Sequence, residues 1–132
     1  MLQGDALMFW DQYAEHFERA ALEHPEAFDM AEIRADVAAG KLMTVGIFDG
    51  VSMIAGACLE LVEMREGKTL HVRYLAGNDM ETWLEELQAR LREIAAAYGC
   101  RWVSLTGRRG WAKRLEVMGY QTVAVQLQCE VA

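Results

Sequence analysis

The sequence predicts one α/β (α+β) domain over residues 1–132, with a mixed, mostly antiparallel sheet flanked by helices. Two observations predict this class. Apolar residues recur at helical spacing in some segments and alternate or run continuously in others, in the order helix, helix, three strands, helix, strand, helix, strand. In addition, a chain of 132 residues with 53% hydrophobic residues and one proline can bury a single core and is not typical of disorder.

Two helices are expected at the start. Residues 5–24 place apolar side chains at helical spacing between acids, and Pro25 ends this helix. Residues 28–40 form the second helix, because Asp29 can cap it and Glu32 follows three residues later. This part of the chain carries most of the net negative charge, which we interpret as a solvated face.

Three strands follow, at 42–48, 51–62 and 69–76. A tight hairpin at Asp49-Gly50 joins the first two, since this dipeptide readily adopts positive φ angles. A charged turn at 65–68 leads to the third strand. We expect the three strands to run antiparallel in sequence.

A long helix is predicted after the third strand. Asn78 is expected to cap it, with Glu81 at the reciprocal capping position. Apolar residues then hold helical spacing until Gly99 stops the helix.

The rest of the chain predicts a strand at 101–106, a short helix at 108–118 and an alternating strand at 120–131. The strand at 101–106 should lie parallel to 69–76, because the long helix between them makes a crossover. The resulting order is ααβββαβαβ.

Composition excludes several classes of protein. The cysteines Cys58, Cys100 and Cys129 are widely spaced and predict reduced core residues of an intracellular, cytoplasmic protein rather than disulfides. The three histidines have no metal-ligand spacing with them, so no metal site is expected. A net charge of -7 argues against general nucleic-acid binding. We expect no signal peptide, and the uncharged stretches are about half the length of a membrane helix.

The ending of the chain supports a family resemblance. The pattern Gly-Cys-x-x-Val-x-Leu at 99–105, a short helix and Gly119-Tyr120, together with the element order, resembles the GNAT acyltransferase fold. More narrowly, the run GCRWVSLTGRRGWAKRLEVMGY is similar to the small GNAT-like proteins encoded in phage and prophage genomes. The resemblance covers nearly the whole chain in topology. It implies acetyl-CoA as the cofactor and, for a phage protein, a location in the host cytoplasm or the virion.

The resemblance also shows where this sequence departs from the catalytic members. Their loop after the central strand carries a basic residue or Gln, followed by glycines whose N–H groups hold the pyrophosphate. The corresponding loop here offers Ala76, Gly77 and Asn78 as the cofactor-binding candidates, without a basic residue. Asp79 and Glu81 follow in the first helical turn, where they would repel a phosphate.

Two further departures concern Leu115 and the first strand. The family's Tyr that protonates the departing thiolate aligns with Leu115, and the chain has little room for a first strand except at 1–4. The resemblance therefore implies a degraded acetyl-CoA site in a non-catalytic or weakly active binding or assembly module of phage or prophage type. The alternative is an acetyl-CoA-dependent N-acyltransferase with a remodelled cofactor site.

If catalysis is retained, His71 has the intrinsic pKa of a general base. Glu60 and Glu63 on the preceding strand are the candidates to orient it or to bind an amine. The alternative for His71 is a histidine on a partly exposed sheet face without a chemical role. Alternation places His71 and Arg73 on one face of the third strand. The residues expected on the opposite face are Leu70, Val72 and Tyr74.

Positive charge gathers near the end of this acidic chain. Residues 101–114 hold five of the thirteen Lys and Arg residues and no acid. We expect the basic patch at 107–114 to contact an acidic protein partner, including a second copy in a dimer, or a CoA phosphate through Arg108 or Arg109. Intramolecular pairing with the many acids is the alternative. Trp111 is expected to be a core or rim anchor.

Overall fold

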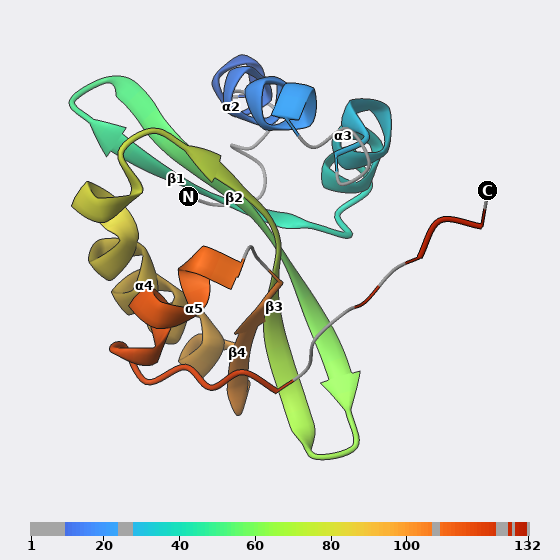
Figure 1. Ribbon diagram of the computed structural model, residues 1–132, viewed down its shortest axis with the longest axis vertical. Helices are drawn as coiled ribbons and strands as arrows, with labels where there is room; N and C mark the ends of the chain where they lie inside the picture. The colour runs from blue at the N-terminus through green and yellow to red at the C-terminus, as the bar shows by residue number, and fades with distance from the viewer. Residues whose placement is uncertain (1–9, 24–27, 107–108, 124–126, 128, 132) are drawn as a thin grey trace.

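The computed structural model describes residues 10–23, 28–106, 109–123, 127 and 129–131, with only the backbone of 109–110. Its elements, in chain order, are α2 (Trp10–Glu23), α3 (Met30–Ala38), β1 (Met43–Asp49), β2 (Ser52–Met64), β3 (Gly67–Gly77), α4 (Met80–Ala97), β4 (Trp102–Leu105) and α5 (Arg109–Glu116). In Figure 1, α2 and α3 lie on one face of the sheet, and α4 and α5 lie on the other.

The sheet has the order β1-β2-β3-β4. The first three strands form an antiparallel meander, whose first hairpin turns at Gly50 with a φ of 65°. β4 pairs parallel to β3, from Thr69 opposite Trp102 to Val72 opposite Leu105. The predicted antiparallel meander and the predicted parallel neighbour across the α4 crossover are both confirmed.

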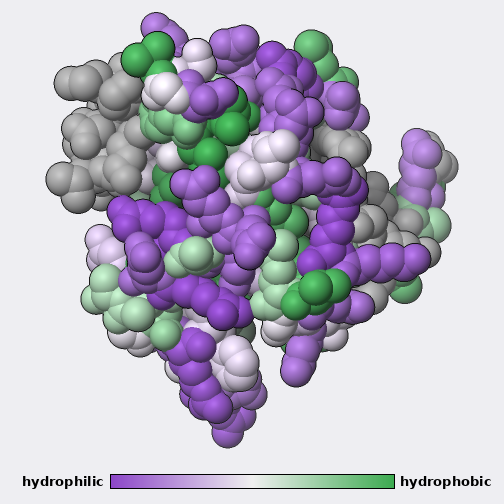
Figure 2. Space-filling model, turned by 90° about the vertical axis from the view of Figure 1, so that its left-hand side faces the viewer, coloured by the Kyte–Doolittle hydropathy of each residue, from purple (hydrophilic) through white to green (hydrophobic). Residues whose placement is uncertain are grey.

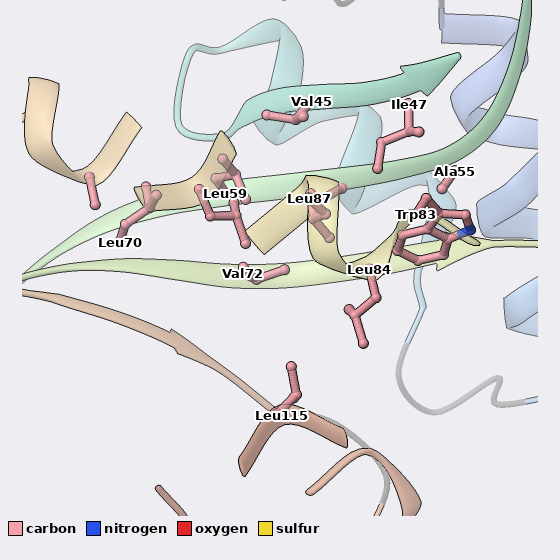
Figure 3. Close-up of a cluster of buried hydrophobic side chains, with 13 residues drawn as sticks. Val45, Ile47, Ala55, Leu59, Leu70, Val72, Trp83, Leu84, Leu87 and Leu115 are labelled. Carbon is pink, nitrogen blue, oxygen red and sulfur yellow. The ribbon is translucent and has the colours of Figure 1, made fainter. Parts of the chain in front are cut away.

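Two apolar clusters fill the two sides of the sheet. The larger cluster lies between the sheet and α4, and Leu115 from α5 points into it (Figure 3). Its buried members are Val45, Ile47, Ala55, Ala57, Leu59, Leu70, Val72, Trp83, Leu84, Leu87, Leu91, Ala95 and Leu115. The smaller cluster lies under α2 and α3, and its buried members are Tyr13, Phe17, Ile33, Val37, Leu42, Met53, Cys58, Tyr74 and Ala76. Trp111 packs against the larger cluster, as expected for an anchor.

A β-bulge interrupts β3. Tyr74 pairs with Cys58, and Val72 pairs with Leu59, so Arg73 is an extra residue with no partner on β2. Because side chains alternate along a strand, one extra residue moves all later side chains to the opposite face. Tyr74 therefore packs under α2 and α3, whereas Val72 packs under α4. The predicted shared face for these two residues is wrong for this reason.

The start of α4 also differs from the prediction. The N-cap is Asp79 rather than Asn78, and Asp79 adopts the left-handed conformation with a φ of 52°. No side chain caps this helix, and Glu81 instead pairs with Arg114 of α5. By contrast, the predicted cap of α3 is confirmed, because the Asp29 carboxylate accepts a hydrogen bond from the N–H of Glu32.

The end of the chain does not form the predicted final strand in its described part. Residues 120–123, 127 and 129–131 have no strand assignment, and Val123 and Leu127 are 89% and 86% exposed. Alternation of apolar residues was not sufficient to predict a strand here, because it does not supply a neighbouring strand to pair with. Cys129 is exposed as well, so the prediction that all three cysteines belong to the core is wrong for this one.

The surface on the side of α4 is largely hydrophilic, with hydrophobic groups in separate places (Figure 2). Among the described residues, no helix is both long and apolar enough to cross a membrane.

Candidate active site

Three adjacent strands bring polar side chains into one row across the sheet. Glu60 on β2 lies opposite His71 on β3, and His71 lies opposite Ser104 on β4. Nδ1 of His71 and Oγ of Ser104 are 2.8 Å apart, which is a hydrogen bond. Since Leu70 and Val72 belong to the cluster under α4, His71 faces the other side of the sheet.

Burial and two charges set the protonation of His71. Its pKa is lowered from the usual 6.5, first because burial disfavours the charged ring. The Glu60 carboxylate raises the pKa and the Arg73 guanidinium lowers it, and the net shift is downward. The imidazole is therefore neutral at pH 7 and can accept a proton.

Arg73, the extra residue of the bulge, lies beside this row. Its Nη1 is 3.5 Å from Oε1 of Glu60, and its guanidinium carbon is 5.6 Å from the centre of the Tyr74 ring. The Glu60 side chain is 27% exposed and that of Arg73 is 43% exposed. Both charged groups are thus accessible to a ligand that approaches His71.

The row lies where β3 and β4 stop pairing. The last parallel pair is Val72 with Leu105, and β3 continues to Gly77 without β4 as its neighbour. Beyond the bulge, the β4 side of β3 is therefore an unpaired strand edge in the described part of the chain. Such an edge can hydrogen-bond the amide groups of an extended ligand.

This strand edge leads directly to the start of α4. Gly77 is required by packing, because a Cβ atom there would lie 2.4 Å from Cβ of Ala55. Asn78 donates its N–H to the carbonyl of Ile54 and accepts a hydrogen bond at Oδ1 from Arg19 of α2. The predicted loop therefore approaches two arginines from other elements, Arg19 through Asn78 and Arg114 through Glu81.

These contacts allow a test of whether the chain fits acetyl-CoA. The first turn of α4 has no side-chain cap, so no side chain from the N-cap residue occupies its N–H groups. Arg114 offsets the charge of Glu81, and Arg19 adds positive charge beside Asn78. The N–H of Thr82 already donates to the carbonyl of Asp79. The other N–H groups of this turn, with arginines nearby, are donors that can bind a pyrophosphate. These residues fit the group, although neither arginine lies in the loop itself and both already contact a side chain.

In its described part, the structure does not bring the other predicted site residues into the row of His71. Glu63 lies opposite Lys68 at the exposed end of the β2–β3 hairpin, away from the row of His71. Ala76 is buried in the cluster under α2 and α3. Arg108 lies outside the described residues, and Arg109 begins α5 with a side chain that is likewise not described.

A cavity in the described structure lies elsewhere. It has a volume of about 450 Å³ and is open between β1 and α4. Its lining residues are Val45, Gly46, Ile47, Phe48, Glu86, Leu87, Ala89, Arg90 and Glu93. None of the groups around His71 reaches it, so it is not part of this candidate site. No group of His, Cys, Asp and Glu side chains in the described ranges could hold a metal ion.

No protein-family model matches the chain, and no curated protein matches its sequence. Solved structures do match. The chain is similar to a tetramutant of the BH1408 protein from Bacillus halodurans, with a TM-score of 0.71, 15% identity and coverage of 99% of this chain and 97% of the other. It is also similar to a predicted acetyltransferase with acetyl-CoA from Clostridium acetobutylicum, with a TM-score of 0.67, 11% identity and coverage of 99% and 93%.

A third similar structure is an aminoglycoside acetyltransferase from an uncultured soil metagenomic sample, with a TM-score of 0.67, 14% identity and coverage of 100% and 95%. At these identities the likeness establishes the fold. In its described residues the chain has the GNAT-like α+β fold of these structures, as the sequence predicted apart from the final strand.

Proposed function

We propose that the protein is an acyl-CoA-dependent N-acyltransferase with a remodelled cofactor site, in which His71 is the general base. One observation carries the proposal. A neutral histidine, hydrogen-bonded to Ser104 and opposite Glu60, lies at the point where β3 and β4 stop pairing. Two of the similar structures are described as acetyltransferases, one of them with acetyl-CoA, which supports the same class of chemistry.

The chain's own residues supply binding, orientation and proton transfer. When bound, acetyl-CoA would supply a thioester whose carbonyl carbon an amine can attack. The uncapped start of α4, with Arg19 and Arg114 nearby, would hold its phosphates. Glu60 would attract the cationic amine, and His71 would take the proton whose loss makes the amine a nucleophile; the second proton, lost as the amide forms, would leave with the CoA thiol. Leu115 is buried and carries no ionisable group, so it has no part in these steps.

The test combines binding and turnover. Acetyl-CoA is titrated by calorimetry, and thiol release is then measured with an aminoglycoside, a polyamine and a lysine-containing peptide. We expect binding, and turnover with at least one amine. His71→Ala should lower kcat/KM by about 10²–10⁴-fold, the usual contribution of a general base. Glu63→Gln, which alters a carboxylate away from His71, is the matched control and should not change it.

A second candidate is a non-catalytic binding or assembly module of phage or prophage type. The observation that favours it is Asp79 at the start of α4, because its carboxylate opposes a phosphate there, whereas the charge of Glu81 is offset by Arg114. Absence of acetyl-CoA binding in calorimetry, in a folded protein, would favour this candidate over the first.

Either candidate includes a partner for the basic patch at 107–114. Lys113 is exposed on α5, which supports a contact with an acidic protein surface or a second copy, whereas Arg114 of the same helix pairs with Glu81. Arg108→Glu with Arg109→Glu should abolish self-association measured by sedimentation, while thermal unfolding remains nearly unchanged. The association should also weaken as salt is raised. Unfolding of the double variant would instead identify the arginines as internal ion-pair partners.

A further inference from the structure

Ser104 is a polar residue in an otherwise apolar strand. Its neighbours Val103 and Leu105 pack against the cluster under α4. Because side chains alternate along β4, Ser104 faces the opposite side, in the row of His71. Its position opposite His71 and the 2.8 Å separation of Oγ and Nδ1 define a specific contact between the two strands.

We infer that Ser104 is the positioning residue of His71: its Oγ accepts a hydrogen bond from the N–H at Nδ1, and this leaves Nε2 unprotonated and available as the base. The inference rests on the proposed role of His71 as the base. It adds the residue that orients the ring and selects the nitrogen that reacts.

The argument depends on the two ring nitrogens being different. A neutral imidazole has one N–H donor and one acceptor nitrogen, so a hydrogen bond donated by Nδ1 to the Ser104 hydroxyl, which can accept as well as donate, makes Nε2 the acceptor. Ser104 engages Nδ1, and no second hydrogen bond to the ring is recorded among the described residues. Glu60 pairs with Arg73 instead, so its carboxylate does not hold a proton on Nε2. Nε2 is therefore the nitrogen that an incoming amine can meet.

Which of the two ring nitrogens of His71 carries the proton matters only when the imidazole is neutral. The charged groups that face His71 are Glu60 from β2 and Arg73 from β3, and they act in opposite directions on its pKa. Burial is the larger influence and favours the neutral ring. At neutral pH the tautomer therefore decides whether His71 can accept a proton through Nε2.

The direct test is heteronuclear NMR of the imidazole nitrogens, which requires no substrate. In the unaltered protein we expect the Nδ1–H tautomer at His71. Ser104→Ala should produce a mixture containing the Nε2–H tautomer, and Ser104→Thr, which keeps the hydroxyl, should restore Nδ1–H. Ser52→Ala, at an exposed serine of β2, is the matched control and should leave the spectrum of His71 unchanged. An Nε2–H tautomer in the unaltered protein, or an unchanged tautomer in Ser104→Ala, would overturn the inference.

Measurements of turnover distinguish the inference about Ser104 from the proposed acyltransferase activity. Ser104→Ala should lower kcat/KM for the amine by about five- to ten-fold, the equivalent of one hydrogen bond, and leave the KM for acetyl-CoA unchanged. If the unaltered protein shows no turnover, the proposed function fails, while the tautomer measurement still decides the role of Ser104. If turnover is present and Ser104→Ala is fully active with the tautomer unchanged, the inference alone fails.

Discussion

The two halves of β3 differ in their neighbours and in the faces they present. Residues 67–72 pair with β4 and bury Leu70 and Val72 under α4. Residues 74–77 have no β4 partner and bury Tyr74 and Ala76 under α2 and α3. Arg73 separates the halves as the extra residue of the bulge.

The difference shows how one residue serves both packing and a site. The bulge lets one strand contribute to two cores, because it reverses the alternation of side chains. It also places Arg73 beside Glu60 and His71 at the point where pairing with β4 ends. The candidate site therefore lies at the boundary between the two halves.

The largest effect is expected from deleting Arg73, which removes this boundary. Deletion restores simple alternation, so Tyr74 would move to the face of α4 and Leu75 to the face of α2. We expect loss of the cooperative thermal transition measured by circular dichroism. Arg73→Ala keeps the extra residue and loses a partly exposed ion pair and the contact with the Tyr74 ring, so it should cost far less, about 1–2 kcal/mol. A deletion variant as stable as the unaltered chain would show that Arg73 is not the extra residue of a β-bulge.

A substitution in the first half of β3, residues 67–72, should lower stability mainly by disturbing the cluster under α4. Leu70 is fully buried, and Leu70→Ala should lower the free energy of unfolding by about 2–5 kcal/mol in a urea titration, through lost burial and a cavity. Leu61→Ala, at a residue that is 37% exposed, is the control and should cost much less. Equal losses for the two variants would show that Leu70 is not in a packed core.

A substitution in the second half of β3, residues 74–77, should lower stability because the new side chain would collide with the backbone of β2. Gly77→Ala places a Cβ atom 2.7 Å from Cα of Ala55 and from the carbonyl oxygen of Ile54. Backbone atoms cannot move aside as a flexible side chain can, so we expect a loss of about 1–3 kcal/mol in the same urea titration. An unchanged midpoint and slope would show that β2 and β3 are further apart at this pair.

At the boundary itself, the pKa of His71 should respond to the two charges in opposite directions. An NMR titration should place the midpoint below 6.5 in the unaltered protein. Arg73→Ala removes a nearby positive charge and should raise the pKa, whereas Glu60→Gln removes a negative charge and should lower it. If His71 is the base, the acid limb of kcat/KM should move with each midpoint. Shifts of the same sign in both variants would contradict this placement of the charges.

The smallest effect is expected from a substitution at the junction between the second half of β3 and α4. Asp79→Asn removes one negative charge from an uncapped helix start and tolerates the left-handed conformation. Acetyl-CoA binding, measured by calorimetry, should tighten by about two- to five-fold. Asp49→Asn, at the end of β1 rather than in the first turn of α4, is the control. Weaker binding by Asp79→Asn would exclude the start of α4 as the phosphate site.

Local signals in the sequence predicted much of the fold. The cap at Asp29 and the hairpin glycine each act within a few residues, and the helical spacing of α4 lies within one segment; the elements they predict are present. The face of Tyr74 and the cap of α4 were predicted wrongly, because a bulge and a left-handed Asp79 break the simple periodic rules.

The candidate site was only partly predictable. Alternation and hairpin pairing were sufficient to suggest Glu60 with His71, which the structure places opposite one another. Ser104, Arg19 and Arg114 were not predicted, because their contacts join elements far apart in the sequence. The available signal for Ser104 was its polar character in an apolar strand that was expected beside the strand of His71.

The connection between β3 and β4 has a consequence for how the chain folds. The meander from β1 to β3 forms between neighbours in sequence, so its closure costs little chain entropy. The hydrogen bond between His71 and Ser104 spans 33 residues and requires the whole α4 crossover to be in place. We therefore expect the row of Glu60, His71 and Ser104 to be completed late in folding, so that a partly folded chain carries the meander without the site.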